Sequence, residues 1–150
     1  QLRGDDEMYA TLDVMLIDPE SGRADSYKLG AAPSVLVSGG RARMITGSAL
    51  PCGILAAVSA AHRLARLRDG DRLIILTDGV CDFSDDDQRQ SLMSLSCALL
   101  SDSPDSAAER LIARMRAKYS LKDDAAVVVI DISARRHTAH RHFFGLHSRK

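Results

Sequence analysis

Two short apolar segments that each meet an aspartate constrain the fold of this chain more than any other feature. The apolar residues 73–76 lead into Thr77-Asp78-Gly79, and Asp123-Asp124 leads into the apolar run 125–130. Apolar runs of this length, bounded by turn residues, are typical of buried strands. A carboxylate at the end of a buried strand must be hydrogen-bonded, ion-paired or bound to a cation, because an unpaired charge is costly to remove from water. The pattern therefore predicts two strands with acidic ends and a cation beside them.

If these two strands are neighbours in one sheet, Asp78 and Asp123 reach the same end of it. We then expect a divalent metal ion held there by carboxylates and water, since two acids alone would repel each other. Such a metal would lower the pKa of a bound water and neutralise a phosphoryl oxygen during displacement. Gly79 would let the main chain approach an ion or phosphate closely. Asp82 could accept a hydrogen bond from a metal-bound water.

Each of these motifs also has an ordinary structural reading. An Asp-Gly pair after a strand is more often a turn than a metal site, and Asp123-Asp124 could be a solvated strand entrance. The acidic run Asp85-Asp86-Asp87 lies where acids favour a helix N-terminus. His62 fits a structural role better than a ligand role. The same holds for the three cysteines as core or loop thiols, Cys52, Cys81 and Cys97.

The composition indicates one globular domain. A chain of 150 residues with 45% hydrophobic residues can bury one core, but not two. No apolar run approaches the roughly 18 residues that a membrane span needs, and the first residues do not resemble a signal peptide. Three widely spaced cysteines fit neither a disulfide framework nor a paired zinc site. We therefore expect a cytoplasmic chain, although a longer parent protein could be tethered to a membrane.

Charge divides the chain into a body, residues 1–134, and a tail, residues 135–150. All 20 acidic residues lie in the body, whereas the tail carries only basic charges and most of the histidines. We expect the tail to be solvated and poorly ordered, without a catalytic role. Contacts between the tail and polyanions or metal are the alternative, and we expect no nucleic-acid partner for the chain.

The first part of the body predicts consecutive hairpins. A β-rich, alternating segment at 9–18 and a second at 24–29 flank the turn Pro19-Glu20-Ser21-Gly22. The same logic pairs 35–37 with 42–45 around a Ser-Gly-Gly turn. This is the pattern of an antiparallel meander.

The middle of the chain predicts one more hairpin and then two helices. The alanine-rich segment 56–67 is compatible with helix or strand, but the short turn at 68–71 before the strand 72–77 favours strand. Apolar residues spaced by three and four predict helices at 85–100 and 106–119, with a Ser-Pro-Asp break between them.

Five segments occur in the order and approximate spacing of one known domain. They are Glu7–Asp13, Lys28–Ser34, Leu50–Leu55, Leu76–Val80 and Asp123–Val128. Together, over about residues 5–133, they resemble the later part of the stage II sporulation protein E phosphatase domain, within the metal-dependent protein phosphatase 2C superfamily. The resemblance implies an α+β fold, an antiparallel β-sandwich flanked by helices, with Mn2+ or Mg2+ held at one end.

The resemblance also implies a function. Members of the family hydrolyse a phosphoserine or phosphothreonine protein with metal-activated water and form no phosphoenzyme. In the sporulation branch the substrate is a phosphorylated anti-sigma-factor antagonist, whose dephosphorylation releases a sigma factor. Asp78 matches the metal-ligand Asp of the family's Asp-Gly motif, and Asp123 matches the first acid of its Asp-Asp/Asn-x-Thr motif. Asp124 is then a neighbouring polar group that shapes the loop.

The sequence departs from the family pattern in two places. Ala126 stands where the family has Thr or Ser, so a hydroxyl near the metal loop is absent. The family also carries an earlier Asp-Gly, before the equivalent of Glu7, whose carboxylate bridges two metals, and Asp5 and Asp6 stand in the wrong context to replace it. We therefore expect a C-terminal portion of a phosphatase domain, with N-terminal strands missing and apolar faces uncovered.

Two functions of other classes stay open. One is a non-catalytic phosphoprotein-binding or regulatory module that keeps the fold without the metals. The other is a phosphotransferase with Asp78 as nucleophile. Such enzymes use a parallel sheet with alternating strands and helices, whereas this chain opens with hairpins.

Overall fold

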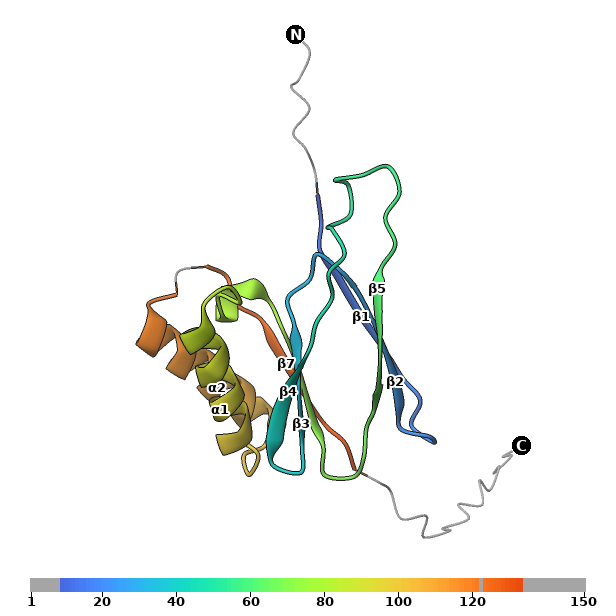
Figure 1. Ribbon diagram of the computed structural model, residues 1–150. Helices are drawn as coiled ribbons and strands as arrows, with labels where there is room; N and C mark the ends of the chain where they lie inside the picture. Colours follow the sequence, from blue (N-terminus) through green and yellow to red (C-terminus); the bar gives the residue numbers. More distant parts are fainter. Residues whose placement is uncertain (1–8, 122, 134–150) are drawn as a thin grey trace, which may run out of the picture.

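The computed structural model describes residues 9–121 and 123–133, which form two antiparallel sheets and a helix pair (Figure 1). The three-stranded sheet has the order β1-β2-β5 and contains β1 (Leu12–Ile17), β2 (Arg23–Leu29) and β5 (Ala61–Arg66). The four-stranded sheet has the order β4-β3-β6-β7 and contains β3 (Ser34–Ser38), β4 (Arg41–Ile45), β6 (Arg72–Leu76) and β7 (Val127–Asp131). The helical elements are the 3-10 turn η1 (Asp78–Val80), α1 (Asp86–Ala98) and α2 (Pro104–Tyr119). The predicted α+β class, an antiparallel sandwich flanked by helices, is confirmed.

The first two predicted hairpins are present. β1 pairs with β2 and β3 pairs with β4, in each case antiparallel. Gly39 and Gly40, which connect β3 to β4, have φ angles of 55° and 74°, a left-handed backbone that glycine adopts without strain. The ambiguous segment 56–67 is a strand from Ala61 onward, where β5 pairs with β2. The preference for strand is therefore confirmed for the second half of that segment. The predicted hairpin between this segment and the strand at 72–77 is wrong, because β5 and β6 belong to different sheets and the turn between them connects the two layers.

Both predicted helices are present, and side chains cap their N-termini. The Asp85 carboxylate accepts hydrogen bonds from two N–H groups of the first turn of α1, which confirms the structural reading of this acidic run. Ser103 caps α2, and Pro104 occupies the first position of that helix. α2 therefore begins two residues before the predicted Ser106, because the Ser-Pro-Asp break between the helices is itself the start of the second helix.

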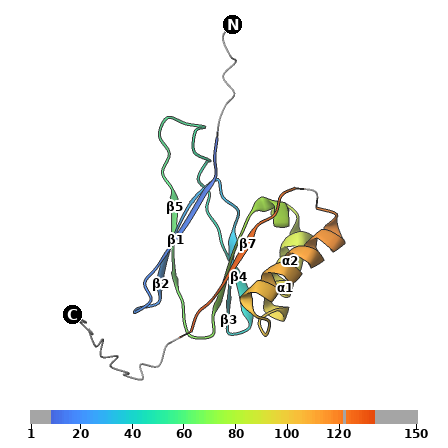
Figure 2. The ribbon, with the colours of Figure 1, turned by 180° about the vertical axis from the view of Figure 1, so that it is seen from behind.

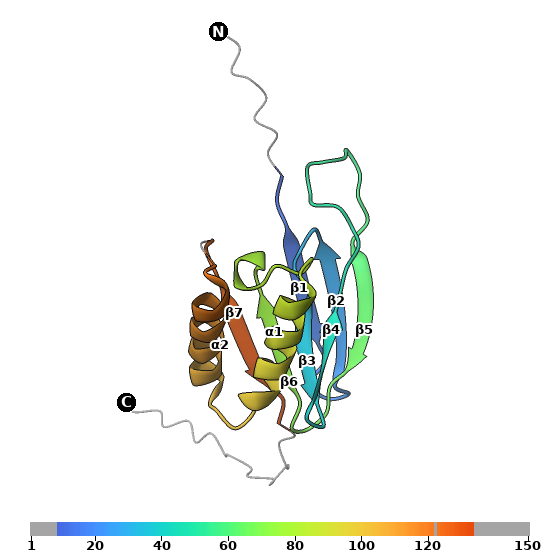
Figure 3. The same ribbon diagram turned by 60° about the vertical axis from the view of Figure 1, so that its left-hand side comes forward.

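The four-stranded sheet is buried on both faces (Figure 3). The layer between this sheet and the helices contains Val35, Val37, Ile74, Leu76, Leu92, Leu111 and Met115. The layer between the two sheets contains Ala24, Leu36, Ala65, Leu73 and Ile75. A strand covered on both sides is apolar throughout, which explains why β3 and β6 show little polar alternation in the sequence.

The three-stranded sheet is covered on one face only within the described residues. Ala24 and Ala65 face the inner core, whereas Leu16 and Leu64, which pair on either side of Asp25, are 59% and 62% exposed. Figures 1 and 2 show both helices on the far side of the four-stranded sheet from this surface. The expectation of uncovered apolar surface agrees with this arrangement.

Candidate metal centre

The two acidic segments lie at one end of the sandwich because β6 and β7 are adjacent antiparallel strands. Leu76, the last residue of β6, pairs with Val127, the first residue of β7. The chain therefore leaves β6 and enters β7 at the same end, the upper end in Figure 1, with Asp78 in η1 just beyond β6. The sequence-based condition for a shared site, that the two strands are neighbours, is met.

The sequence predicts that Asp123 opens its strand, and the structure shows that this prediction is wrong. β7 begins at Val127, and Asp123 lies four residues before it in a loop. The regular β6–β7 ladder ends at the Leu76–Val127 pair, because the next residue, Thr77, bonds to Ala126 with its side chain as well as its main chain. The N–H of Thr77 donates to the Ala126 carbonyl oxygen (3.1 Å), and Thr77 Oγ1 accepts from the Ala126 N–H (3.0 Å).

Gly79 allows a close approach between the two acidic loops. A Cβ atom built on Gly79 would collide with the carbonyl group of Asp124, lying 2.8 Å from its carbon atom. Real Cβ atoms do not approach backbone atoms so closely, so this packing requires glycine. The sequence predicts that the main chain at Gly79 approaches an ion or phosphate, and in the structure the close neighbour is the main chain of Asp124.

Contacts from the two helices hold the acidic loops in place. Arg116 of α2 donates from Nη2 to the carbonyl oxygen of Asp123 (3.3 Å), and Asp123 Oδ1 accepts from the Asp124 N–H (2.8 Å). The buried Gln88 side chain of α1 accepts from the Asp82 N–H (2.9 Å). The loops are therefore held by side chains that bond to their main chain, two of them from the helices and one from Asp123 itself.

Asp78, Asp123 and Asp124 are all exposed, and no hydrogen bond or ion pair to the carboxylates of Asp78 and Asp124 occurs within the described residues. Asp82 differs from them because its Oδ1 accepts from both the N–H and the hydroxyl of Ser84, which lowers the pKa of the Asp82 carboxyl. Asp82 is thus engaged in its own loop.

The donor chemistry of this end fits a hard divalent cation in part. Two neighbouring loops offer carboxylate oxygens, the ligand type that Mn2+ and Mg2+ prefer. Among the described residues, however, no group of three or more acidic, histidine or cysteine side chains is placed to hold a metal. Asp5 and Asp6 lie outside the described residues. Asp78 and Asp123 would therefore supply part of a coordination shell, with the remaining positions open to water and other groups.

The other reactive side chains singled out in the sequence have structural roles. Burial raises the pKa of the Cys81 thiol to about 11, so this residue is a protonated core thiol at neutral pH. His62 lies on β5, where its ring stacks on Tyr27 with centroids 4.7 Å apart and its Nε2 lies 2.7 Å from Asp25 Oδ1. Hydrogen bonds from Arg23, the larger cause, and from His62 lower the pKa of Asp25 to about 2. His62 has no described contact with the acidic loops, and Cys81 contacts them through its main chain, whose N–H donates to the Asp78 carbonyl oxygen (3.2 Å).

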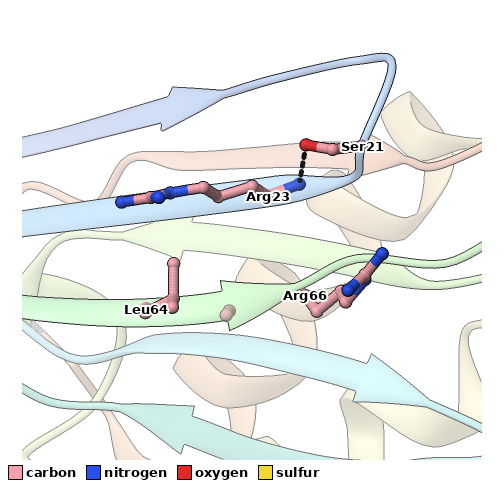
Figure 4. A pocket seen from close by; sticks show the side chains of 5 residues that line it. Ser21, Arg23, Leu64 and Arg66 are labelled. Atoms are coloured by element: carbon pink, nitrogen blue, oxygen red, sulfur yellow. Dashed lines mark hydrogen bonds between the residues drawn. The ribbon is translucent and has the colours of Figure 1, made fainter.

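A surface hollow lies at the opposite end of the sandwich from the acidic loops. It is lined by Ser21, Arg23, Leu64, Ala65 and Arg66, and Ser21 Oγ accepts from the Arg23 N–H across 3.2 Å (Figure 4). Among the described residues, its lining contains no carboxylate that could bind a metal or act as a general base. The candidate site is therefore assigned to the acidic loops and not to this hollow.

Sequence reasoning missed three residues that shape the site. Thr77, Gln88 and Arg116 each bond to the main chain of a loop that carries an acid. Thr77 stands directly before the Asp-Gly pair, so its position was a usable signal. The partners of Gln88 and Arg116 lie six and seven residues away in the chain, and the path of the loop between them decides which groups meet.

Comparison with protein families identifies the domain type. The family profile described as Stage II sporulation protein E (SpoIIE) matches residues 1–133. The curated Stage II sporulation protein E of Bacillus subtilis (strain 168) is 34% identical over 79 residues, which are 53% of this chain and 10% of that protein. The equivalent protein of Priestia megaterium is 33% identical over 79 residues, or 14% of its length. The matched segment thus spans a small fraction of these curated relatives.

Solved structures show the same fold. The PP2C phosphatase domain of the Bacillus subtilis cell fate determinant SpoIIE, solved with a fragment of its regulatory domain, superposes with a TM-score of 0.75 at 28% identity, covering 88% of this chain and 41% of that one. A manganese-presoaked crystal of the same phosphatase domain gives a TM-score of 0.70 at 26% identity, covering 88% and 61%. Within the part of the chain that the structure describes, no helix is long and apolar enough to cross a membrane.

Proposed function

This chain belongs to the stage II sporulation protein E (SpoIIE) family, and on that premise we propose that it takes part in hydrolysing phosphoserine or phosphothreonine in a protein substrate. The observation that carries the proposal is the meeting of the two acidic loops. The loop of Asp78 and the loop of Asp123 are joined by the Thr77–Ala126 hydrogen bonds and by the close contact of Gly79 with Asp124.

Asp78 and Asp123 are the proposed ligands of Mn2+ or Mg2+. When bound there, the metal supplies an acidified water and positive charge for the phosphoryl group. The chain itself contributes two exposed carboxylates on loops whose main chain is bonded by the side chains of Thr77, Gln88 and Arg116, so little reorganisation is needed when a cation binds. Gly79 and Asp124 shape the two loops, and Asp82 is proposed as a neighbouring acceptor for a metal-bound water.

The proposed substrate is a phosphorylated anti-sigma-factor antagonist. The family resemblance and the match to SpoIIE phosphatase domains support it. The acidic loops lie on the surface, so a phosphorylated loop or terminus of a folded protein can approach them. The division into a body at 1–134 and a tail at 135–150 stays a prediction, since the tail lies outside the described residues. A bridging carboxylate from an earlier Asp-Gly strand and a cytoplasmic location also stay predictions.

The experiment is Asp78→Asn in the full-length protein that carries this sequence. We expect manganese-dependent release of phosphate from a phosphoserine protein to fall by at least about 100-fold, because removing a metal-ligand charge weakens binding steeply. The free energy of unfolding should change by less than about 0.5 kcal/mol, since the side chain is exposed and makes no described contact. Glu109→Gln, an exposed acid on α2, is the matched control and should keep full turnover.

Two outcomes separate this proposal from its rivals. If the full-length protein neither binds manganese in a titration nor releases phosphate, the non-catalytic phosphoprotein-binding module replaces it. If Asp78 itself becomes phosphorylated during turnover, the phosphotransferase replaces it. All five pairings between the described strands are antiparallel, unlike the parallel sheet on which the phosphotransferase depends.

A further inference from the structure

Thr77 occupies the junction between the two acidic loops. It follows β6 directly and precedes Asp78. Its carbonyl oxygen accepts from the Val80 N–H, and its two other hydrogen bonds go to Ala126, the residue before β7. One of these bonds is of the ordinary main-chain type. The other uses the Thr77 hydroxyl oxygen in the place where a main-chain carbonyl would continue the ladder, so it depends on this side chain.

The Thr77 hydroxyl makes the last hydrogen bond between the β6 side and the β7 side before the two acidic loops diverge. Beyond Ala126 the chain turns through Asp124 to Asp123, and these residues have no further ladder partner on β6. On the β6 side, the residue after Asp78 is Gly79, which touches the Asp124 carbonyl group. Thr77 thus holds Ala126 by hydrogen bonds, and Gly79 leaves room for the Asp124 carbonyl group. Asp78 lies between these two contacts in the sequence.

Ala126 has no hydroxyl of its own, and its N–H donates to the hydroxyl oxygen of Thr77. A hydroxyl is therefore present at the junction, supplied by the opposite strand.

We propose that Thr77 is a positioning residue for the metal centre: its side chain clamps the Asp123 loop against Asp78 and so sets the spacing of the two ligands. The inference rests on the proposed function, because it assumes that Asp78 and Asp123 bind one metal centre. Residues that orient metal ligands through hydrogen bonds typically contribute about 10-fold or more to metal affinity.

The test compares Thr77→Val, which keeps the shape and removes the hydroxyl, with Thr77→Ser, which keeps the hydroxyl, in the full-length protein. Manganese titration should show affinity about 10-fold weaker in Thr77→Val and close to wild type in Thr77→Ser. In the metal-free protein, hydrogen exchange of the Ala126 amide should be faster in Thr77→Val only. Ser103→Ala, which removes the cap of α2, is the control for stability loss alone and should keep manganese affinity.

The outcomes distinguish this inference from the proposed function. Wild-type manganese affinity or unchanged Ala126 exchange in Thr77→Val, with affinity lost in Asp78→Asn, would overturn the role of Thr77 and leave the metal site standing. Wild-type affinity in Asp78→Asn as well would overturn both. Equal losses in Thr77→Val, Thr77→Ser and Ser103→Ala would assign the effect to stability and also overturn the inference.

Discussion

The two ends of the β6–β7 pair differ in whether their charged side chains have bonding partners. At the lower end in Figure 1, the buried Arg72 side chain donates to both oxygens of Asp131 (2.5 and 2.8 Å) and to the carbonyl oxygens of Leu99 (2.6 Å) and Asp102 (2.7 Å). At the upper end, Asp78 and Asp124 are exposed acids without a described side-chain partner.

This difference gives Arg72 a structural role and leaves the acids at the upper end available as metal ligands. Arg72 ties β6, β7 and the end of α1 together, and its donors are matched by four acceptors. The upper acids gather negative charge on loops fixed by other groups, an arrangement that favours a cation. The comparison predicts that mutations at the lower end affect stability, whereas mutations of the upper acids affect metal binding.

The largest expected effect is at Arg72. Arg72→Met should lower the free energy of unfolding by about 3 kcal/mol, because it leaves the acceptors of a buried guanidinium unpaired. Chemical denaturation monitored by circular dichroism measures the change. Arg110→Met, which breaks an exposed pair with Asp102, is the matched control and should lower it by less than about 1 kcal/mol. Equal effects of the two variants would break the comparison.

The next effect is at Gly79, where the upper end is packed as tightly as a core. Gly79→Ala should destabilise the protein by about 1 to 3 kcal/mol, because the new methyl group must displace the Asp124 carbonyl group. The same denaturation measurement applies. Gly39→Asn, at a left-handed position with open space around it, should change stability by less than about 0.5 kcal/mol. A stable Gly79→Ala protein would show that the two loops can separate.

The smallest effect is the pH dependence at the lower end. Hydrogen bonds from Arg72 lower the pKa of Asp131 below its usual value. A carboxyl with a lowered folded-state pKa stabilises the fold above its unfolded pKa of about 4, and this contribution is lost as the pH falls through the folded value. The stability difference between wild type and Asp131→Asn should therefore be present at pH 7 and shrink below about pH 4. A stability difference that stays constant with pH would show that the Arg72–Asp131 ion pair does not stabilise the fold.

Local patterns predicted the elements well because their signals are short-range. The first two hairpins follow from alternation and turn residues, and both helices have the expected spacing. The third predicted hairpin was wrong, because a short turn can also connect strands of two different sheets, as it does between β5 and β6. The start of α2 was placed late because Ser103 and Pro104 look like a break until their capping geometry is seen. The strand entry at Asp123 was wrong, since the end of a ladder depends on the partner strand, and here the Thr77 hydroxyl ends it.

The sequence alone determined where most of the strands and helices lie and that acids stand beside two apolar segments, because periodicity, caps and turn residues act over a few positions. The tertiary structure decided that β6 and β7 are neighbours, that Gly79 meets Asp124, and that Arg72 is satisfied by a strand and a helix end. These contacts join residues far apart in the chain. Their partners follow from strand register and helix packing, which only the burial of the whole core selects.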